Sequence, residues 1–371
     1  MIPSDDQSVE EQRRALAEAF NQEVDPLARY EQTFETTGID PFELYIEDVL
    51  STKSLRPGTI RHYEAAFEQW RAFMEEQDRH PACPHEYLVK RFANHLMTER
   101  DNTADTVEKK LLRLNKAYEH WQHDPVFPHP QDYNPFKLAM TKLELHQSDP
   151  PDPPNLSVGE IAEKLRSVTH IRDRAIILIQ LKLGLRATEV ANIEIADVHL
   201  TNREVRRFYT DMATHWMVED RPNAVCIPAK FDRPGNKSKR PRVLPIDDEL
   251  RSALIRYLLV RPDAETNALL LTKQNHHPIE NDTVMAVWKQ PFSEYAQSER
   301  YRPINSHYGR HFFTTYWTVG QDLNRELVKY MRGDVVRHQT LGDRGAIDDY
   351  IHTYYEDIEP IYRERIYKFT V

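Results

Sequence analysis

The strongest constraint on the fold of this chain is a proline-rich stretch near its middle. Four of the residues from 147 to 155 are prolines, which forbid a helix and stiffen the backbone. A chain of 371 residues is expected to form two or three domains. We therefore place a linker at residues 147–156. Behind it, Ser157 and Glu160 have the spacing of a capping box, which predicts the start of a helix.

The region before the linker has the hydrophobic periodicity of helices and no strand pattern. In residues 41–146, apolar side chains recur every three or four residues in stretches that begin near Pro57, Leu88 and Asp105. This predicts an all-helical domain. Residues 1–40 form an acidic N-terminal extension with a thin apolar stripe. A solvated arm is favoured there, and a helix that packs on a partner subunit is the alternative.

The region after the linker, residues 157–371, has mixed patterns. An apolar helix is predicted at 171–183 and another at 247–260. Short strands are predicted at 198–209, 225–229, 242–246 and 269–271. Further helices are predicted at about 281–299, 306–319, 322–331 and 344–354. The fold class is therefore mainly α with a small β-sheet, a helical domain followed by a mixed α/β domain with a C-terminal tail.

The charge of the chain is unevenly distributed. Residues 1–50 contain 13 acidic and 3 basic residues, and the remaining 321 contain 46 of each. The net charge of −10 therefore lies in residues 1–50, and the rest of the chain has room for basic patches. Arg outnumbers Lys by 33 to 16. Acidic surface with little Lys favours a salt-adapted host, such as an archaeon or its virus or plasmid, although ordinary drift in composition is nearly as good an explanation.

Composition and the N-terminus also bear on the compartment. Cys83 and Cys226 are far apart and form no CxxC motif, which fits a reducing cytosol and excludes a disulfide scaffold. The sequence has no apolar run of transmembrane length, and its start lacks the pattern of a signal peptide. We therefore expect a cytoplasmic protein that does not bind a membrane.

Two groups of basic residues are candidate contacts to a nucleic acid. One lies along the helix predicted from Asp105 to Trp121 and consists of Lys109, Lys110, Arg113 and Lys116. The other lies in a predicted loop between two strands, around the turn Pro234-Gly235-Asn236, and consists of Lys230, Arg233, Lys237, Lys239, Arg240 and Arg242. Each group is either an ordinary solvated surface or a set of phosphate contacts, with one loop lysine able to act as a general acid.

Three further pieces carry possible chemistry. Arg186 follows Gly184, with Glu189 placed to orient its guanidinium group. His307 and Arg310 lie three residues apart and so share a helix face. Tyr350 lies about forty residues later. Two arginines suit a phosphate, and a tyrosine can form a covalent intermediate. Taken singly, a helix-end cation, a capping histidine and a structural tyrosine are the better explanations.

Together these pieces resemble the tyrosine recombinase family, which includes phage integrases and Xer-type recombinases. Gly184-Leu185-Arg186 with Glu189 is similar to the first arginine box of the family, and the run 237–245 is similar to its lysine hairpin. By spacing, Lys237 matches the family lysine best, with Lys239 and Lys230 behind it. His307-Tyr308-Gly309-Arg310-His311 is similar to the HxxRH box, and Tyr350-Ile351-His352 to the box of the nucleophile.

The resemblance has one departure. Asp334 stands where the family has a second His or a Trp. His338 follows four residues later as a possible substitute, and the longer gap to Tyr350 leaves Tyr354 and Tyr355 as lesser candidates for the nucleophile.

The resemblance implies a DNA strand transferase in which Arg186 and Arg310 hold the scissile phosphate. Tyr350 would form a 3′-phosphotyrosyl link, Lys237 would protonate the leaving hydroxyl, and His307 would assist. It further implies double-stranded DNA as substrate, a dimer on each site and a tetrameric synapse, with no metal and no cofactor. A DNA-binding protein that no longer cleaves and a type IB topoisomerase-like enzyme are the alternatives. The apolar C-terminal residues from Ile358 to Phe369 fit either docking on a neighbouring subunit or folding back on their own core.

Overall fold

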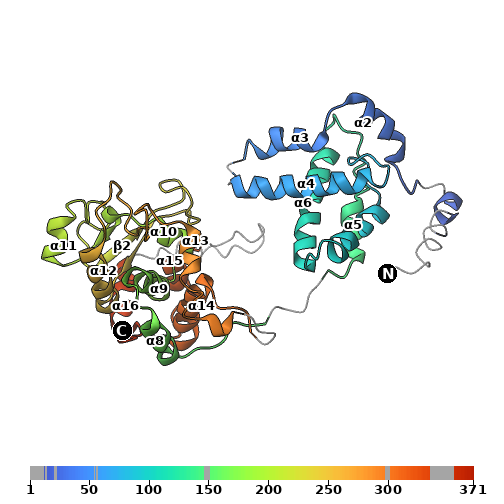
Figure 1. Ribbon diagram of the computed structural model, residues 1–371. Helices are drawn as coiled ribbons and strands as arrows, with labels where there is room; N and C mark the ends of the chain where they lie inside the picture. Colours follow the sequence, from blue (N-terminus) through green and yellow to red (C-terminus); the bar gives the residue numbers. More distant parts are fainter. Residues whose placement is uncertain are drawn as a thin grey trace. The chain divides into compact units, whose positions relative to one another are not determined.

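The computed structural model has two compact units, Met1–Asp149 and Pro150–Val371 (Figure 1). The described residues are 12, 15–20, 23–53, 55, 57–145, 151–296, 301–334 and 355–371. In this part of the chain, no helix combines the length and the hydrophobicity that a membrane crossing requires.

The described part of the first unit is entirely helical. Its α-helices are α2 (Glu31–Thr37), α3 (Pro41–Tyr45), α4 (Pro57–Glu75), α5 (Glu86–Thr98), α6 (Ala104–His123) and α7 (Pro135–Lys142), with a 3₁₀ turn at Ala28–Tyr30 and a π turn at Ile46–Leu50. Asp40, Thr103 and Asn134 cap α3, α6 and α7 with their side chains. The apolar faces of α4 to α7 meet in a core that contains Trp70, Phe92 and Trp121. The predicted helical character of this region is confirmed.

Part of the acidic N-terminal segment belongs to this core. Leu27 is fully buried, and Asp25 and Glu31 form ion pairs of 2.9 and 3.1 Å with Arg79. The segment from Asp25 onward therefore packs on its own unit.

The second unit combines helices with a small sheet. Its α-helices are α8 (Val158–Ser167), α9 (Ile171–Leu183), α10 (Ala187–Ala191), α11 (Arg203–Phe208), α12 (Asp248–Val260), α13 (Asn281–Ala286), α14 (Ser306–Thr315), α15 (Arg325–Arg332) and α16 (Tyr355–Arg365). Shorter turns are the 3₁₀ turns Ile195–Asp197 and Ser293–Tyr295 and the π turn Tyr316–Gly320. The strands β1 (Val198–His199), β2 (Ala224–Ile227) and β3 (Arg242–Pro245) form one antiparallel sheet in the order β1-β2-β3.

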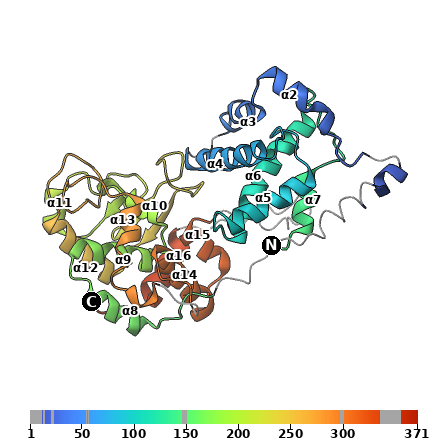
Figure 2. The same ribbon diagram turned by 45° about the vertical axis from the view of Figure 1, so that its right-hand side comes forward.

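Helix α9 is the centre of this unit. It lies between α12 and α14 (Figures 1 and 2), and ten of its residues are buried, as its apolar sequence predicts. The capping box of Ser157 and Glu160 is confirmed at the start of α8. Three predicted segments are shorter than expected. Only 198–199 of the segment 198–209 is strand, because Asn202 caps α11 through the backbone N–H of Val205.

Two further segments also differ from their predictions. The segment 269–271 forms only an isolated bridge between Leu271 and Pro278. The helix predicted over 281–299 ends at Ala286, ahead of Pro291, which cannot donate a helical hydrogen bond. The helix predicted at 344–354 lies outside the described residues.

The two faces of the sheet have different neighbours. Leu244 of β3 and Val225 of β2 face the main core of the unit. Val243 and Cys226 face the opposite way and form a small cluster with Tyr355, because successive strand residues alternate between faces. The Arg242 side chain, two residues before Leu244, shares the face of the main core. This alternation decides which side chains reach the candidate site.

The C-terminal segment folds back on its own core. Ile358, Tyr362 and Phe369 are each 1% exposed and belong to the main core. Lys182 of α9 is fully buried beneath them, with its Nζ 2.9 Å from Asp247 Oδ2 and 2.7 Å from Glu249 Oε2. Of the two alternatives, docking on a neighbouring subunit or folding back, the structure has this segment folded back on the core of its own chain.

Candidate active site

The two arginines reach the site from different helices. Arg186 stands at the N-terminus of α10, directly after the left-handed turn at Gly184 (φ 61°) that ends α9. A Cβ on Gly184 would lie 2.5 Å from the Phe313 ring of α14, so glycine is required for this close approach. The Gly184 carbonyl oxygen accepts a hydrogen bond of 2.7 Å from Arg310 Nη1. The end of α9 thus brings Arg186 and Arg310 together.

The Arg310 guanidinium group is buried and makes three hydrogen bonds. Its Nη1 donates to the carbonyl oxygens of Gly184 and Arg332, the second at 2.9 Å. Its Nη2 donates to Asp334 Oδ1 at 2.6 Å. Burial, followed by the charge of Arg186, lowers the pKa of Arg310. Two cations this close need a shared anion, and Asp334 supplies it.

Asp334 bridges the arginines. Its Oδ1 accepts from Arg186 Nη2 at 2.7 Å as well as from Arg310, and its Oδ2 lies 3.0 Å from Arg332 Nε. The carboxylate is 27% exposed. The two partners of Oδ1 are therefore the candidate catalytic arginines.

His307 lies beside the same charges. Asn305 caps α14 by accepting from the backbone N–H of His307 at 2.9 Å. Partial desolvation lowers the pKa of the His307 imidazole, and the charges of Lys237, Arg310 and Arg186 lower it further. Since its ordinary pKa is about 6.5, His307 is neutral at pH 7 and can accept or share a proton. Lys237 belongs to the loop between β2 and β3.

The position of Lys237 can be checked through this histidine. We expect an NMR titration of the His307 ring to give a pKa below about 6.5. Replacing Lys237 by methionine should raise it, because one of the neighbouring positive charges is lost. Lys239→Met is the matched control, since it removes an exposed charge from the same loop. Equal pKa values in all three proteins would contradict the placement of Lys237.

The loop that carries Lys237 is anchored by amide side chains. Asn236 is buried, and its Nδ2 donates to the Pro228 carbonyl at 2.9 Å while its Oδ1 accepts from Asn192 at 3.0 Å. Lys237, Lys239 and Arg240 remain exposed. Arg233 has a structural role, because it pairs with Asp197 at 3.2 Å. The loop therefore presents some of its basic residues and uses others to hold its shape.

Arg242 has a role that the sequence did not reveal. It is 2% exposed, and its Nη1 and Nη2 donate to the two oxygens of Glu189 at 3.2 and 3.1 Å. Its Nε donates to the Met331 carbonyl at 2.9 Å. The only signal for this role was the alternation of β3, which turns Arg242 toward the main core. Arg242 joins β3 to the start of α10 and the end of α15.

Glu189 completes this network. It is 1% exposed, and its Oε2 accepts from the backbone N–H of Arg186 at 2.9 Å. Burial acts to raise the pKa of Glu189, but the charges of Arg242 and Arg186 and their hydrogen bonds outweigh it, so the pKa is lowered. Glu189 orients the backbone of Arg186 as well as its guanidinium group, which lies 3.3 Å away.

The candidate nucleophile lies outside the described residues, as does His338. The lesser candidate Tyr354 is also outside them, whereas Tyr355 is described. Its ring is buried on the opposite face of the sheet, and the Arg221 guanidinium group lies 5.3 Å above it. Its hydroxyl is 3.5 Å from Arg363 Nη2. Burial raises the pKa of Tyr355, with Glu359 adding to the effect, so this phenol is a poor nucleophile.

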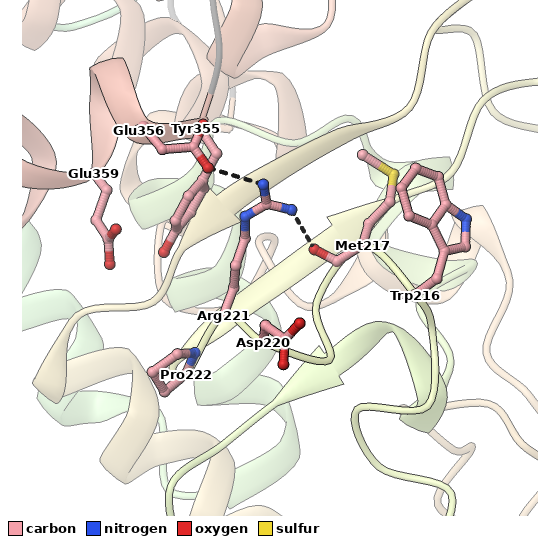
Figure 3. A pocket seen from close by; sticks show the side chains of 8 residues that line it. All are labelled: Trp216, Met217, Asp220, Arg221, Pro222, Tyr355, Glu356 and Glu359. Atoms are coloured by element: carbon pink, nitrogen blue, oxygen red, sulfur yellow. Dashed lines mark hydrogen bonds and ion pairs between the residues drawn. The ribbon is translucent and has the colours of Figure 1, made fainter.

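An open pocket of about 390 Å³ adjoins Tyr355 (Figure 3). Within it, Arg221 donates to Glu356 Oε1 and to the Met217 carbonyl, both at 2.8 Å. The pocket is lined by neither Arg186 nor Arg310, so it is separate from the arginine site. Among the described residues, no group of three or more His, Cys, Asp and Glu could hold a metal ion.

The basic residues of the first unit form a stripe on α6. Lys109 and Lys116 are exposed, and Lys110 and Arg113 are partly exposed, opposite the buried Leu111 and Leu114. Lys109 pairs with Asp105 of the same helix, and Lys110 donates to Asn102 Oδ1 at 2.9 Å. Arg113 Nη1 donates to the neutral Lys109 carbonyl at 3.3 Å, and Lys116 is exposed, so these two residues keep the most available charge in the stripe.

Comparisons with known proteins agree with this architecture. A family model described as the phage integrase family matches residues 157–323. Tyrosine recombinase XerC of Psychromonas ingrahamii is 22% identical over 282 residues, which cover 74% of this chain and 81% of the relative.

Solved structures share the fold at low sequence identity. The Tn1549 transposon integrase in complex with transposon right end DNA is 18% identical, with a TM-score of 0.57, over 88% of this chain and 99% of that one. A lambda integrase dimer bound to a COC′ core site is 10% identical, with a TM-score of 0.59, over 92% and 89%. With its mainly helical fold and small sheet, the chain carries a phage integrase family domain and is a tyrosine-type recombinase.

Proposed function

We propose that this protein cuts and rejoins double-stranded DNA at specific sites through a 3′-phosphotyrosyl intermediate on Tyr350. One observation carries the proposal. Arg186 and Arg310 donate to a single carboxylate oxygen at 2.7 and 2.6 Å, which is the arrangement that a non-bridging oxygen of a phosphodiester needs. Integration, excision and the resolution of dimers would all use this chemistry.

The roles follow from the chemistry of the groups. The Tyr350 phenol oxygen attacks phosphorus, and the bond to the 5′ oxygen breaks. Lys237 gives a proton to that oxygen, and His307 accepts the phenol proton or hydrogen-bonds the phosphate. Arg186 and Arg310 stabilise the negative charge on the non-bridging oxygens of the phosphate in the transition state. Attack by a 5′-hydroxyl on the phosphotyrosine then rejoins a strand, so the phosphodiester energy is retained throughout.

The assembly on DNA is proposed by analogy with lambda integrase. The solved lambda integrase structures include a dimer bound to a core site and a tetramer bound to a Holliday junction. A dimer on each DNA site and a tetrameric synapse are therefore proposed here, with residues 41–146 as the core-binding domain, residues 157–371 as the catalytic domain and the cytoplasm as the location. A salt-adapted archaeal host rests on composition alone, and the relatives reported above lend it no support.

The α6 stripe should appear in the salt dependence of DNA binding. Each phosphate contact adds about 0.9 to the slope of log K against log salt. Replacing Arg113 and Lys116 together by glutamine should lower the magnitude of that slope by roughly 1.8, as measured by fluorescence anisotropy. The charge-conserving pair Arg113→Lys and Lys116→Arg is the control and should keep the slope. An unchanged slope in the glutamine protein would remove α6 from the DNA contacts.

A covalent adduct assay tests the function itself. The protein is incubated with a nicked suicide duplex that carries its recombination site or, before that site is known, with supercoiled plasmid. Denaturing gels then report protein that is covalently bound to DNA. We expect an adduct with the wild type and with Tyr354→Phe, and none with Tyr350→Phe. An adduct that persists in Tyr350→Phe would refute the assigned nucleophile.

Binding without any adduct would favour the non-cleaving alternative, which the contact of Asp334 with both arginines supports. Relaxation without recombination would favour the topoisomerase-like alternative.

A further inference from the structure

Asp334 occupies the place between Arg186 and Arg310 that a phosphate oxygen would take. Arg310 uses Nη1 for two carbonyl oxygens, which leaves Nη2 as the group that meets Asp334 Oδ1. Arg186 Nη2 meets the same oxygen. A phosphate oxygen that enters the site would need the same two Nη2 groups. It can bind both of them only after the Asp334 carboxylate has moved away.

The other carboxylate of the network cannot take over this part. Glu189 is fully buried and has both oxygens committed to Arg242. Asp334 is more accessible, with about a quarter of its side chain exposed. It follows the left-handed Gly333 (φ 64°), and its backbone N–H donates to the Lys329 carbonyl at 3.0 Å. The carboxylate can therefore leave the arginines by side-chain rotation while the end of α15 stays intact.

We propose that Asp334 is an internal phosphate mimic, which occupies the arginine site of the DNA-free protein and is displaced by the scissile phosphate. The proposal rests on the proposed function, because it takes Arg186 and Arg310 as the phosphate site. A tethered carboxylate competes at a high effective concentration. Free phosphate, with no other contacts, is excluded, whereas a duplex has many phosphate contacts to offset the displacement. Before DNA binds, the carboxylate keeps the two neighbouring guanidinium groups paired and in position.

The test uses the full-length, DNA-free protein and inorganic phosphate. Melting temperatures are recorded against sodium phosphate and against sodium chloride at equal ionic strength. For the wild type we expect the two salts to act alike. For Asp334→Asn, whose amide keeps the size but not the charge, phosphate should raise the melting temperature by about 3–6 °C at ten times its dissociation constant. Asp334→Ala is run beside it, in case the asparagine amide itself blocks the site.

Two controls fix the location of the effect. Asp322→Asn removes the same charge from an exposed carboxylate and should respond as the wild type does. Adding Arg186→Gln to Asp334→Asn should abolish the phosphate response. A response that survives this addition, or one that is equal in the wild type and in both Asp334 variants, would overturn the proposal.

Duplex binding gives an independent measurement. Without a competing carboxylate, Asp334→Asn should bind DNA about tenfold more tightly than the wild type, at the same salt concentration. Weaker or equal binding would count against displacement. These readouts require no cleavage, so they can fail while Tyr350 forms its adduct, and they can succeed if Tyr350 is not the nucleophile.

Discussion

Replacing Arg310 by lysine is expected to slow DNA cleavage by about 10²–10³-fold, which is typical for the loss of one preorganised donor at a developing charge. The guanidinium group of Arg310 holds two carbonyl oxygens through Nη1 and an anion through Nη2. A lysine ammonium group is a point charge on a flexible stem and cannot reproduce this fork. The positive charge is kept, so the variant separates geometry from net charge.

The measurement is a single-turnover cleavage rate on a saturating suicide duplex. Arg302→Lys is the matched control, because Arg302 is exposed and its backbone N–H, which the substitution keeps, donates to the Asp152 carbonyl. It should retain the wild-type rate. Circular dichroism and the melting temperature must show that Arg310→Lys is folded. A rate within threefold of the wild type would contradict the role given to Arg310.

Separating Glu189 from Arg242 is expected to cause the largest loss of stability. Either Glu189→Gln or Arg242→Met leaves one charge without its partner in the interior, which typically costs about 3–5 kcal/mol. The double variant removes both charges, so its loss should be well below the sum of the two single losses. Urea unfolding of the four proteins of this cycle gives the coupling free energy. Arg240→Met, which changes an exposed residue of the β2–β3 loop just before Arg242, should be near neutral. Additive losses would show that the ion pair is not the source of the effect.

The same pair predicts how stability depends on pH. The folded protein lowers the pKa of Glu189, and the unfolded value is about 4.3. The folded state therefore binds fewer protons than the unfolded state in this range. The stabilising contribution of Glu189 is fully present above its unfolded pKa and is lost as the pH falls through its folded pKa. Glu189→Gln should show a weaker loss of stability below about pH 4.3 than the wild type.

Many local features of this fold could be predicted because their causes are local. The helix from Ile171 to Leu183 was predicted with its observed bounds, because its apolar run ends at a glycine. The capping box at Ser157 follows from two side chains on one helical turn. The strand predicted over 198–209 is wrong beyond residue 199, because the Asn202 side chain caps α11 and starts a helix inside that segment.

The sequence by itself determined the helical first unit, the mixed second unit and the order of the candidate residues Arg186, Lys237, His307 and Arg310. Only the tertiary structure decided how their charges are paired. Asp334 meets both arginines, and Arg242 turns inward to Glu189, through contacts between segments far apart in the chain. Helix periodicity and caps depend on neighbours within a few residues. The partner of a buried charge depends on which distant segments the packed core brings together, and no spacing in the sequence specifies that.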